Sequence, residues 1–469
     1  MSRSRSPVDR SVPPPPGEIR PFHFPRFLRT RLTSGLEVLA ARLSGLPLVS
    51  LEVVTPAGGQ FDPEGKAGLA ALSASLLDEG TTRRSAMEIA TAAERLGGYL
   101  SSGADWDVGY VSAGLLAGYR EAGFDLLQEV LLSPTFPEEE IERLCNQRLA
   151  EIVRRNQDPS SLADDRLYRA IYQGTAYANP LAGTEESIPR LDRSSVLAFY
   201  GSHYGLAGAQ LIAVGDFDPE ELLREAERLF GGSPGSGAAP PPNPEIRPAP
   251  LAGISVHLVD RSGAAQTELR LGHAGVPRNH PDYVPLVVLN TLLGGKFTSR
   301  INLNLRERHG YTYGASSRFT PRLGPGPFTV SAAVETESAG AAAREVLAEL
   351  RRVREDLVEP EEIEETVSYI VGVFPYTLQT VGDLAKRLET IAVFDLPDDY
   401  YDRYPERILA VTREKLLEVA QRHLDPDRIA VVAVGPVEEL EPQFEGLGSV
   451  SVGAPEGEPE VASAGPIAG

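Results

Sequence analysis

The stretch GGKFTSRINLNLRERHGYTYGASS, residues 294–317, combines a glycine turn, an amphipathic segment, a second glycine and an aromatic run. Ile301 and Leu305 alternate with polar and charged residues as on one face of a helix, and Gly310 stands where a left-handed glycine ends a helix. Residues 311–315 are mainly aromatic or β-branched, which favours a strand. The sequence therefore predicts a helix that stops just before Gly310 and passes directly into a sheet.

This reversal is expected to bring Arg306, in the last helical turn, close to Tyr313 in the strand. A guanidinium carries five fixed donors and a phenol carries one, so the pair could grip a peptide carbonyl or an oxyanion that forms on it. The ordinary alternative is an arginine that favours the helix dipole and a tyrosine that packs on the sheet. The residues alone leave both readings open.

The composition excludes several classes of protein. The chain has 469 residues with 42% hydrophobic content, enough for two or more cores. It carries 45 Lys and Arg against 66 Asp and Glu, a net charge of -21, which disfavours nucleic acid and anionic membranes as partners. A single cysteine, Cys145, excludes an internal disulfide and a thiolate metal cluster.

Shifts in composition divide the chain. Residues 1–23 are proline-rich without the apolar core of a secretory signal, and residues 449–469 are rich in Gly, Pro, Ala and Glu, so both ends are expected to be disordered. Residues 233–253 read as a Pro/Gly linker between two α+β domains, 24–232 and 254–448. No apolar window is long enough to span a membrane, and a cytoplasmic protein is expected.

The second domain repeats the first in outline, which indicates an internal duplication. His203 and the apolar run at residues 211–215 are echoed 220 positions later by His423 and residues 431–435. Both copies read as a helix end followed by a buried strand that stops at a glycine.

Residues 68–81, GLAALSASLLDEGT, resemble the inverted zinc motif of the pitrilysin or insulinase-type metallopeptidases, in which Gly-Leu-Ala-His-x-x-Glu-His leads to Gly-Thr. The frame fits without gaps, but Ala71, Ala74 and Ser75 stand where the two zinc histidines and the general base would be. The family's third ligand, a glutamate, matches Glu151, which lies 76 positions beyond Ser75.

This resemblance implies that the chain itself binds no zinc and is inactive alone. Zinc needs about three protein ligands, and Glu151 is the one that remains. The seven histidines include no helical i, i+4 pair, and His273 and His280 are expected at the surface or in loops. Restoring the motif with Ala71→His, Ala74→Glu and Ser75→His is expected to create zinc affinity if Glu151 faces the same space.

Arg306 and Tyr313 match the family's second motif, approximately Leu-Arg-x-x-x-Gly-x-x-Tyr, at the same spacing of seven. In the subgroup similar to mitochondrial processing peptidase, this pair completes a zinc site in the partner unit. The resemblance implies two similar α+β domains, each an antiparallel sheet with flanking helices, that together form half of a clamshell.

The resemblance thus implies the zinc-less arginine/tyrosine subunit of a bacterial heterodimeric peptidase that hydrolyses unfolded peptides. Zinc is expected in a homologous partner subunit, and Gly294 and Gly295 are expected to let the partner or the peptide approach the backbone closely. One alternative is a catalytically inert structural subunit of a larger assembly. A second alternative, an active homodimer with zinc bound elsewhere, is disfavoured by the shortage of ligands.

Overall fold

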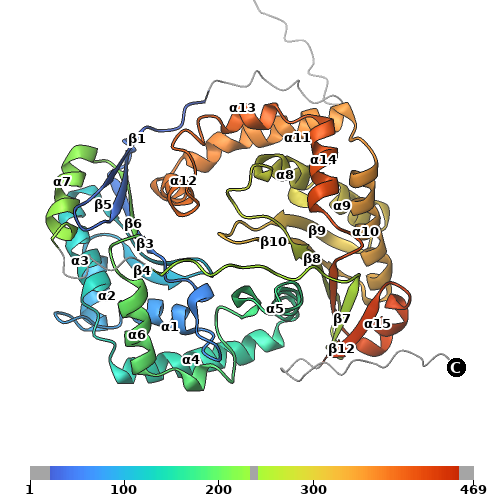
Figure 1. Cartoon of the computed structure of the whole chain (residues 1–469), viewed down its shortest axis with the longest axis horizontal. Helices are drawn as coiled ribbons and strands as arrows, with labels where there is room; N and C mark the ends of the chain where they lie inside the picture. Colours follow the sequence, from blue (N-terminus) through green and yellow to red (C-terminus); the bar gives the residue numbers. More distant parts are fainter. Residues whose placement is uncertain (1–21, 233–240, 454–469) are drawn as a thin grey trace, which may run out of the picture.

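The structure is a computed structural model that describes residues 22–232 and 241–453. It contains two six-stranded sheets at opposite ends of the molecule, with helices around and between them (Figure 1). The first sheet has the order β1-β2-β6-β3-β5-β4, and the second has the order β12-β7-β11-β8-β10-β9. Their strands are β1 (Phe27–Arg31), β2 (Glu37–Arg42), β3 (Leu48–Thr55), β4 (Tyr99–Ala104), β5 (Gly109–Leu116) and β6 (Gln210–Gly215), then β7 (Ser255–Asp260), β8 (Thr267–Ala274), β9 (Thr312–Phe319), β10 (Pro327–Val334), β11 (Ala430–Gly435) and β12 (Ser449–Gly453).

Five strands match in order, with β2, β6, β3, β5 and β4 corresponding to β7, β11, β8, β10 and β9, which agrees with the predicted duplication. The outer strands differ, because β1 pairs antiparallel with β2 whereas β12 pairs parallel with β7. The predicted α+β architecture is confirmed, but the sheets are mixed rather than antiparallel. β2 pairs with β6 in parallel, and β7 pairs in parallel with both β11 and β12. The long helical excursion between the paired strands allows this parallel pairing, which no hairpin could make.

The helices of the first half are α1 (Leu69–Ser75), α2 (Ala86–Arg95), α3 (Arg120–Leu132), α4 (Glu138–Gln157), α5 (Pro159–Ile171), α6 (Arg193–His203) and α7 (Pro219–Phe230). Those of the second half are α8 (Tyr283–Asn290), α9 (Arg300–Asn302), α10 (Ala339–Glu355), α11 (Pro360–Val373), α12 (Val381–Val393), α13 (Tyr404–Leu409), α14 (Arg413–His423) and α15 (Val437–Phe444). No helix of the described residues combines the length and apolar character needed to cross a bilayer.

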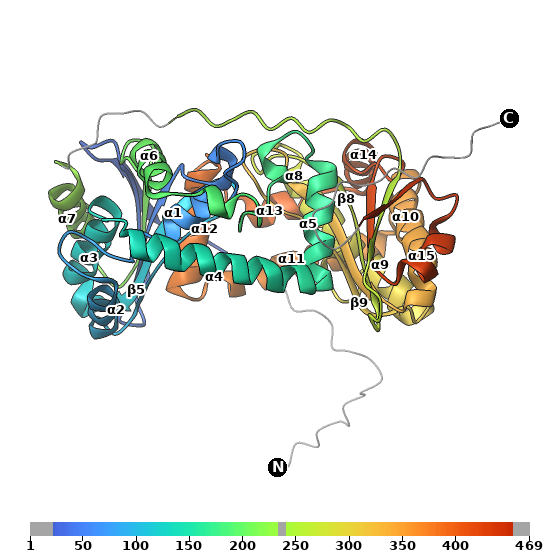
Figure 2. The same cartoon turned by 90° about the horizontal axis from the view of Figure 1, so that it is seen from below.

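Two helices cross over and cover the sheet of the other half. α5 contacts β8 and β11 of the second sheet, and α12 contacts β3 and β6 of the first. Leu167 of α5 shares a buried cluster with Val432, while Leu384 of α12 shares one with Ile212. Figure 2 shows α4 running from the first sheet toward α5 beside the second. The range 24–232 contains every strand of the first sheet, whereas 254–448 omits β12 of the second sheet, and the crossing helices pack the two halves against each other.

The structure also revises the predicted ends. Residues 449–453 form β12, so the predicted disordered tail does not begin at 449. Phe22, placed in the predicted leader, packs edge-on against Phe374 with 5.1 Å between ring centroids. Of the predicted linker, residues 241–253 form no helix or strand and bury Ile246. The predictions for residues 1–21, 233–240 and 454–469 lie outside the described residues.

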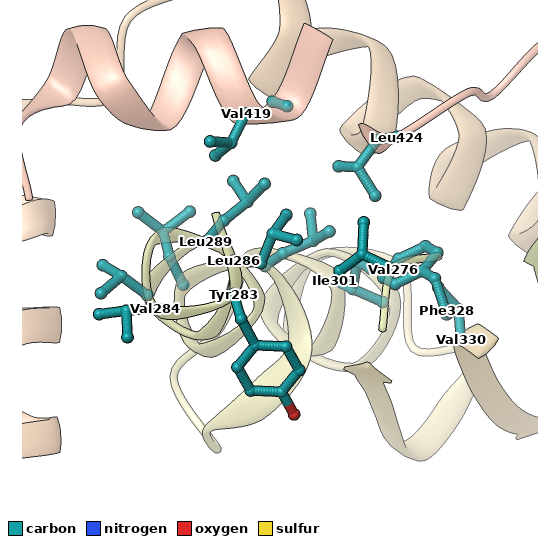
Figure 3. Packing of buried hydrophobic residues seen from close by; sticks show 14 of the residues in the cluster. Val276, Tyr283, Val284, Leu286, Leu289, Ile301, Phe328, Val330, Val419 and Leu424 are labelled. Carbon is teal, nitrogen blue, oxygen red and sulfur yellow. The ribbon is translucent and has the colours of Figure 1, made fainter. Parts of the chain in front are cut away.

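The core of the second half fixes the segment that decides the fold. Figure 3 shows Leu286 and Leu289 of α8 directed toward Val419 and Leu424, and Ile301 of α9 beside Phe328. Ile301 and all these leucines are buried within one cluster. Burying such side chains stabilises a fold by about 1.5–3 kcal/mol each, so the start of α9 is held rigidly against the sheet.

Candidate functional site

The helix-to-strand reversal forms as predicted. α9 continues as the widened, π-type turns of η6 (Leu303–Arg308), which end at His309, and Gly310 adopts the left-handed conformation with φ 71°. The backbone N–H of Tyr311 donates to the carbonyl of Leu305 at 2.8 Å and closes the helix end. Helix π-bulges are frequent at functional sites, and this one carries Arg306 in its last turn.

Tyr313 projects from a β-bulge on the edge strand β9. Thr312 pairs with Val334 and Ala315 with Ala332, so Tyr313 and Gly314 together face one residue of β10. Bulges of this kind re-aim a side chain, and Tyr313 is 90% exposed. The ordinary expectation of a half-buried packing tyrosine is therefore wrong.

Arg306 lies beside this strand with its guanidinium over the ring of Phe297, 4.6 Å from the centroid. Its Nε lies 3.5 Å from Oε1 of Glu307, and its side chain is 35% exposed. η6 packs on β9, but no hydrogen bond joins Arg306 to Tyr313 among the described residues. The predicted proximity thus holds for the two elements, and both polar groups remain accessible.

Two asparagines that sequence reasoning missed, buried Asn302 of α9 and half-buried Asn290 of α8, hold their helices to strand β9. Asn302 donates from Nδ2 to the carbonyl of Phe297 at 2.7 Å and accepts at Oδ1 from the N–H of Ala315 at 3.0 Å. Asn290 donates to the carbonyl of Ser317 at 3.0 Å, and the hydroxyl of Ser317 donates back to it at 2.9 Å. An asparagine at an otherwise apolar position of a helix was the sequence signal that could have indicated these contacts.

The structure gives the two glycines different surroundings. Gly294 is buried, and a Cβ there would lie 2.4 Å from Oγ and 2.5 Å from the backbone N of Ser317. Its close approach is thus to β9 of its own chain, which corrects the expected role toward a partner or peptide. Gly295 is exposed, and its expected role toward a partner stays a prediction.

The degenerate zinc motif forms α1, packed on α4. Ala71 and Ala74 are buried without ligand atoms, and the hydroxyl of Ser75 donates to the carbonyl of Ala71 at 3.0 Å. Glu151 is exposed on α4, one turn beyond Arg148, whose Nη2 donates to Oγ of Ser75 at 2.8 Å. A guanidinium at the motif and a single exposed carboxylate do not fit a zinc ion.

One group among the described residues brings three metal-type ligands together, namely His280, Asp282 and His423, whose ligand atoms lie within 4.8 Å of one another. Asp282 already pairs with Lys415 at 2.9 Å and Arg422 at 2.8 Å. Burial opposes its ionisation, but hydrogen bonds from His423, Lys415 and Arg422 outweigh burial and hold the pKa of this carboxyl well below its usual range.

His280 is also engaged, because its Nδ1 accepts the N–H of Asp282 at 3.1 Å. A metal would have to displace two cations and break this bond, so the cluster is an ion network rather than a metal site. His280 lies in the loop before α8, as expected. His273 is 7% exposed and packs on Phe328, so the prediction of a surface position is wrong.

α1 thus carries Ala71, Ala74 and Ser75 at the positions that the resemblance assigns to the zinc ligands and the general base. Two family models match it: "Insulinase (Peptidase family M16)" over residues 38–185 and "Peptidase M16 inactive domain" over residues 190–369. The chain belongs to this M16 peptidase family, as the resemblance implied.

Three relatives illustrate the similarity. A protein of Rickettsia bellii described as an uncharacterized zinc protease is 26% identical over 412 residues, 87% of this chain and 97% of that protein. The crystal structure of a peptidase M16 inactive domain from Pseudomonas fluorescens has a TM-score of 0.82 and 26% identity, covering 87% of this chain and 98% of its own. A protease from Helicobacter pylori shares the fold with a TM-score of 0.84 at 19% identity, over 88% of this chain and 100% of its own.

Proposed function

We propose that this chain is the zinc-less subunit of a heterodimeric zinc peptidase that hydrolyses unfolded peptides. A homologous partner with an intact His-x-x-Glu-His helix holds the zinc, which activates the attacking water. Arg306 and Tyr313 of this chain bind the carbonyl of the scissile peptide and donate hydrogen bonds to the oxyanion that forms on it. A chamber closed by two such subunits admits peptides without a stable fold.

The observation that carries this proposal is the contrast between the two halves of the chain. The first half has lost its ligands at Ala71, Ala74 and Ser75. The second half keeps Tyr313 90% exposed on a bulge, beside an arginine that is stacked and accessible. A large aromatic side chain held out of the core adds little to the stability of this chain, so its exposure favours a role toward a ligand.

A catalytically inert structural subunit is the competing function. Such a subunit would need the surfaces of the fold but neither the guanidinium of Arg306 nor the hydroxyl of Tyr313. The two functions therefore differ in whether removing these groups affects hydrolysis without affecting assembly.

The test is reconstitution with a family member from the same organism that carries the intact zinc motif. Each chain is purified alone and then mixed, with sizing, zinc analysis and cleavage of a fluorogenic unstructured peptide measured on all three samples. We expect a one-to-one complex that cleaves the peptide, whereas this chain alone holds no stoichiometric zinc and cleaves nothing. One tightly held zinc in this chain alone, or an assembled complex without activity, would contradict the proposal.

A further inference from the structure

A guanidinium occupies the space of the degenerate zinc motif. Nη2 of Arg148 donates to the carbonyl of Ala71 at 2.7 Å and to the hydroxyl of Ser75 at 2.8 Å. Ala71 and Ser75 are the two positions where the family places its histidine ligands. A single nitrogen of α4 therefore bridges both former ligand positions of α1.

Two carboxylates complement this cation. Asp62 accepts the N–H groups of Gly68 and Ala70, both at 2.7 Å, and so caps the start of α1. Burial lowers the pKa of Arg148, and the charges of Glu151 and Asp62 oppose that fall. Burial likewise raises the pKa of Asp62, to about 7, although the N–H groups of Ala70 and Gly68 and, to a smaller extent, the charge of Arg148 oppose the rise. The guanidinium is therefore held at the motif mainly by its hydrogen bonds to Ala71 and Ser75, and the nearby carboxylates offset part of the cost of burying its charge.

We propose that Arg148 takes the place of the metal ion in this motif and is an independent barrier to binding a divalent cation. It supplies one positive charge that interacts with the charges of Asp62 and Glu151, and it joins α1 to α4 through its bonds to Ala71 and Ser75. The loss of the ligands is therefore only part of why the chain holds no zinc. This inference concerns residues of this chain alone and does not depend on the proposed partner.

The geometry predicts that restoring the ligands alone does not create a tight zinc site, which revises the expectation drawn from the sequence. An imidazole at position 75 would meet the guanidinium that now lies 2.8 Å from the Ser75 hydroxyl. A zinc ion there would also face a fixed positive charge a few ångströms away in a partly desolvated site. Glu151 lies three residues after Arg148 on α4, so removing the arginine opens space at the motif and takes away a cation close to this carboxylate.

The experiment compares three variants of the full chain. The first carries A71H, A74E and S75H, and the second adds R148M. The third replaces that addition with R154M, which removes an exposed arginine of the same helix. Zinc affinity is measured by calorimetric titration with zinc chloride, and metal content is measured after dialysis.

We expect one zinc per chain in the variant with R148M, with an affinity on the order of 100-fold or more above the other two. Equal zinc affinity in all three variants would overturn the proposal. Failure of the folded R148M variant to bind zinc would also overturn it.

A second measurement keeps the proposal testable if the multiple variants do not fold. R148M alone removes the two hydrogen bonds that join α4 to Ala71 and Ser75 of α1 and is expected to lower the thermal midpoint, whereas R154M alone is expected to leave it within about 1 °C. Equal midpoints for these two single variants would show that Arg148 is not the cation that holds the motif.

Discussion

The ionisation of Glu52 is expected to make the stability of the fold depend on pH where α12 packs on the first sheet. It lies in the centre of β3, on the first sheet, which α12 covers. Burial raises the pKa of Glu52 to about 7, the charge of Glu389 on α12 raises it further, and Lys386 opposes both. Glu389 pairs with Lys386 at 2.5 Å, and burial raises its pKa too, with Asp105 acting in the same direction.

The magnitude follows from the difference between the pKa of Glu52 in the two states. A glutamate with a pKa of 4.5 unfolded and about 7 folded favours the folded state at low pH, and this stability is lost as pH rises toward 7. At about 1.4 kcal/mol per tenfold change in proton affinity, the ionised group costs about 3 kcal/mol above pH 8 and about 1–1.5 kcal/mol at pH 5.5.

Glu52→Gln removes the charge and keeps the shape. We expect the variant to exceed the parent chain in free energy of unfolding by about 3 kcal/mol at pH 8.5 and by about half that or less at pH 5.5. The assay is urea unfolding at both values, with Glu94→Gln on the exposed face of α2 as the matched control. A gain that does not change with pH, or a loss of stability at pH 8.5, would refute the reasoning.

Two further substitutions test the packing. Gly294→Ala places a Cβ 2.5 Å from the backbone N of Ser317 and is expected to lower the free energy of unfolding in urea by about 1–3 kcal/mol. The control Gly314→Ala, with no atom within 4 Å of its Cβ, should change little. Equal effects would contradict the close packing of η5 (Thr291–Gly295) on β9. Arg322→Met removes a guanidinium 4.0 Å from the ring centroid of Trp106, the one tryptophan of the chain, and should cost about 1–2 kcal/mol and shift the tryptophan emission. Unchanged emission and stability would mean that this contact between the two halves does not stabilise the fold.

The residues of the segment 294–317 were sufficient to predict its local structure. Gly310, the alternation around Ile301 and the aromatic run after it determine a helix, a left-handed stop and a strand without help from distant residues. The sequence also showed the duplication, because each half contains an apolar strand that ends at a glycine, Gly215 in β6 and Gly435 in β11.

The features that sequence reasoning missed depend on distant contacts. The amphipathic patterns of α5 and α12 show which face of each helix is buried, but they do not show which sheet covers it, since either sheet would bury the same apolar face. The sequence of α4 does not single out Arg148 among its charged residues, and the packing of α4 on α1 brings it to Ala71 and Ser75. The exposure of Tyr313 follows from a bulge in the pairing with β10, which the sequence of β9 alone does not reveal.

The most direct test of the central claim is the turnover of an unstructured peptide by the complex reconstituted with Tyr313→Phe. Because this side chain is 90% exposed and the substitution removes only its hydroxyl, assembly and thermal midpoint should not change. If the hydroxyl donates to the oxyanion, the rate should fall by about 10²- to 10³-fold, the cost of losing one such donor. Full turnover by the intact Tyr313→Phe complex would contradict the account and leave this chain as a wall of the chamber.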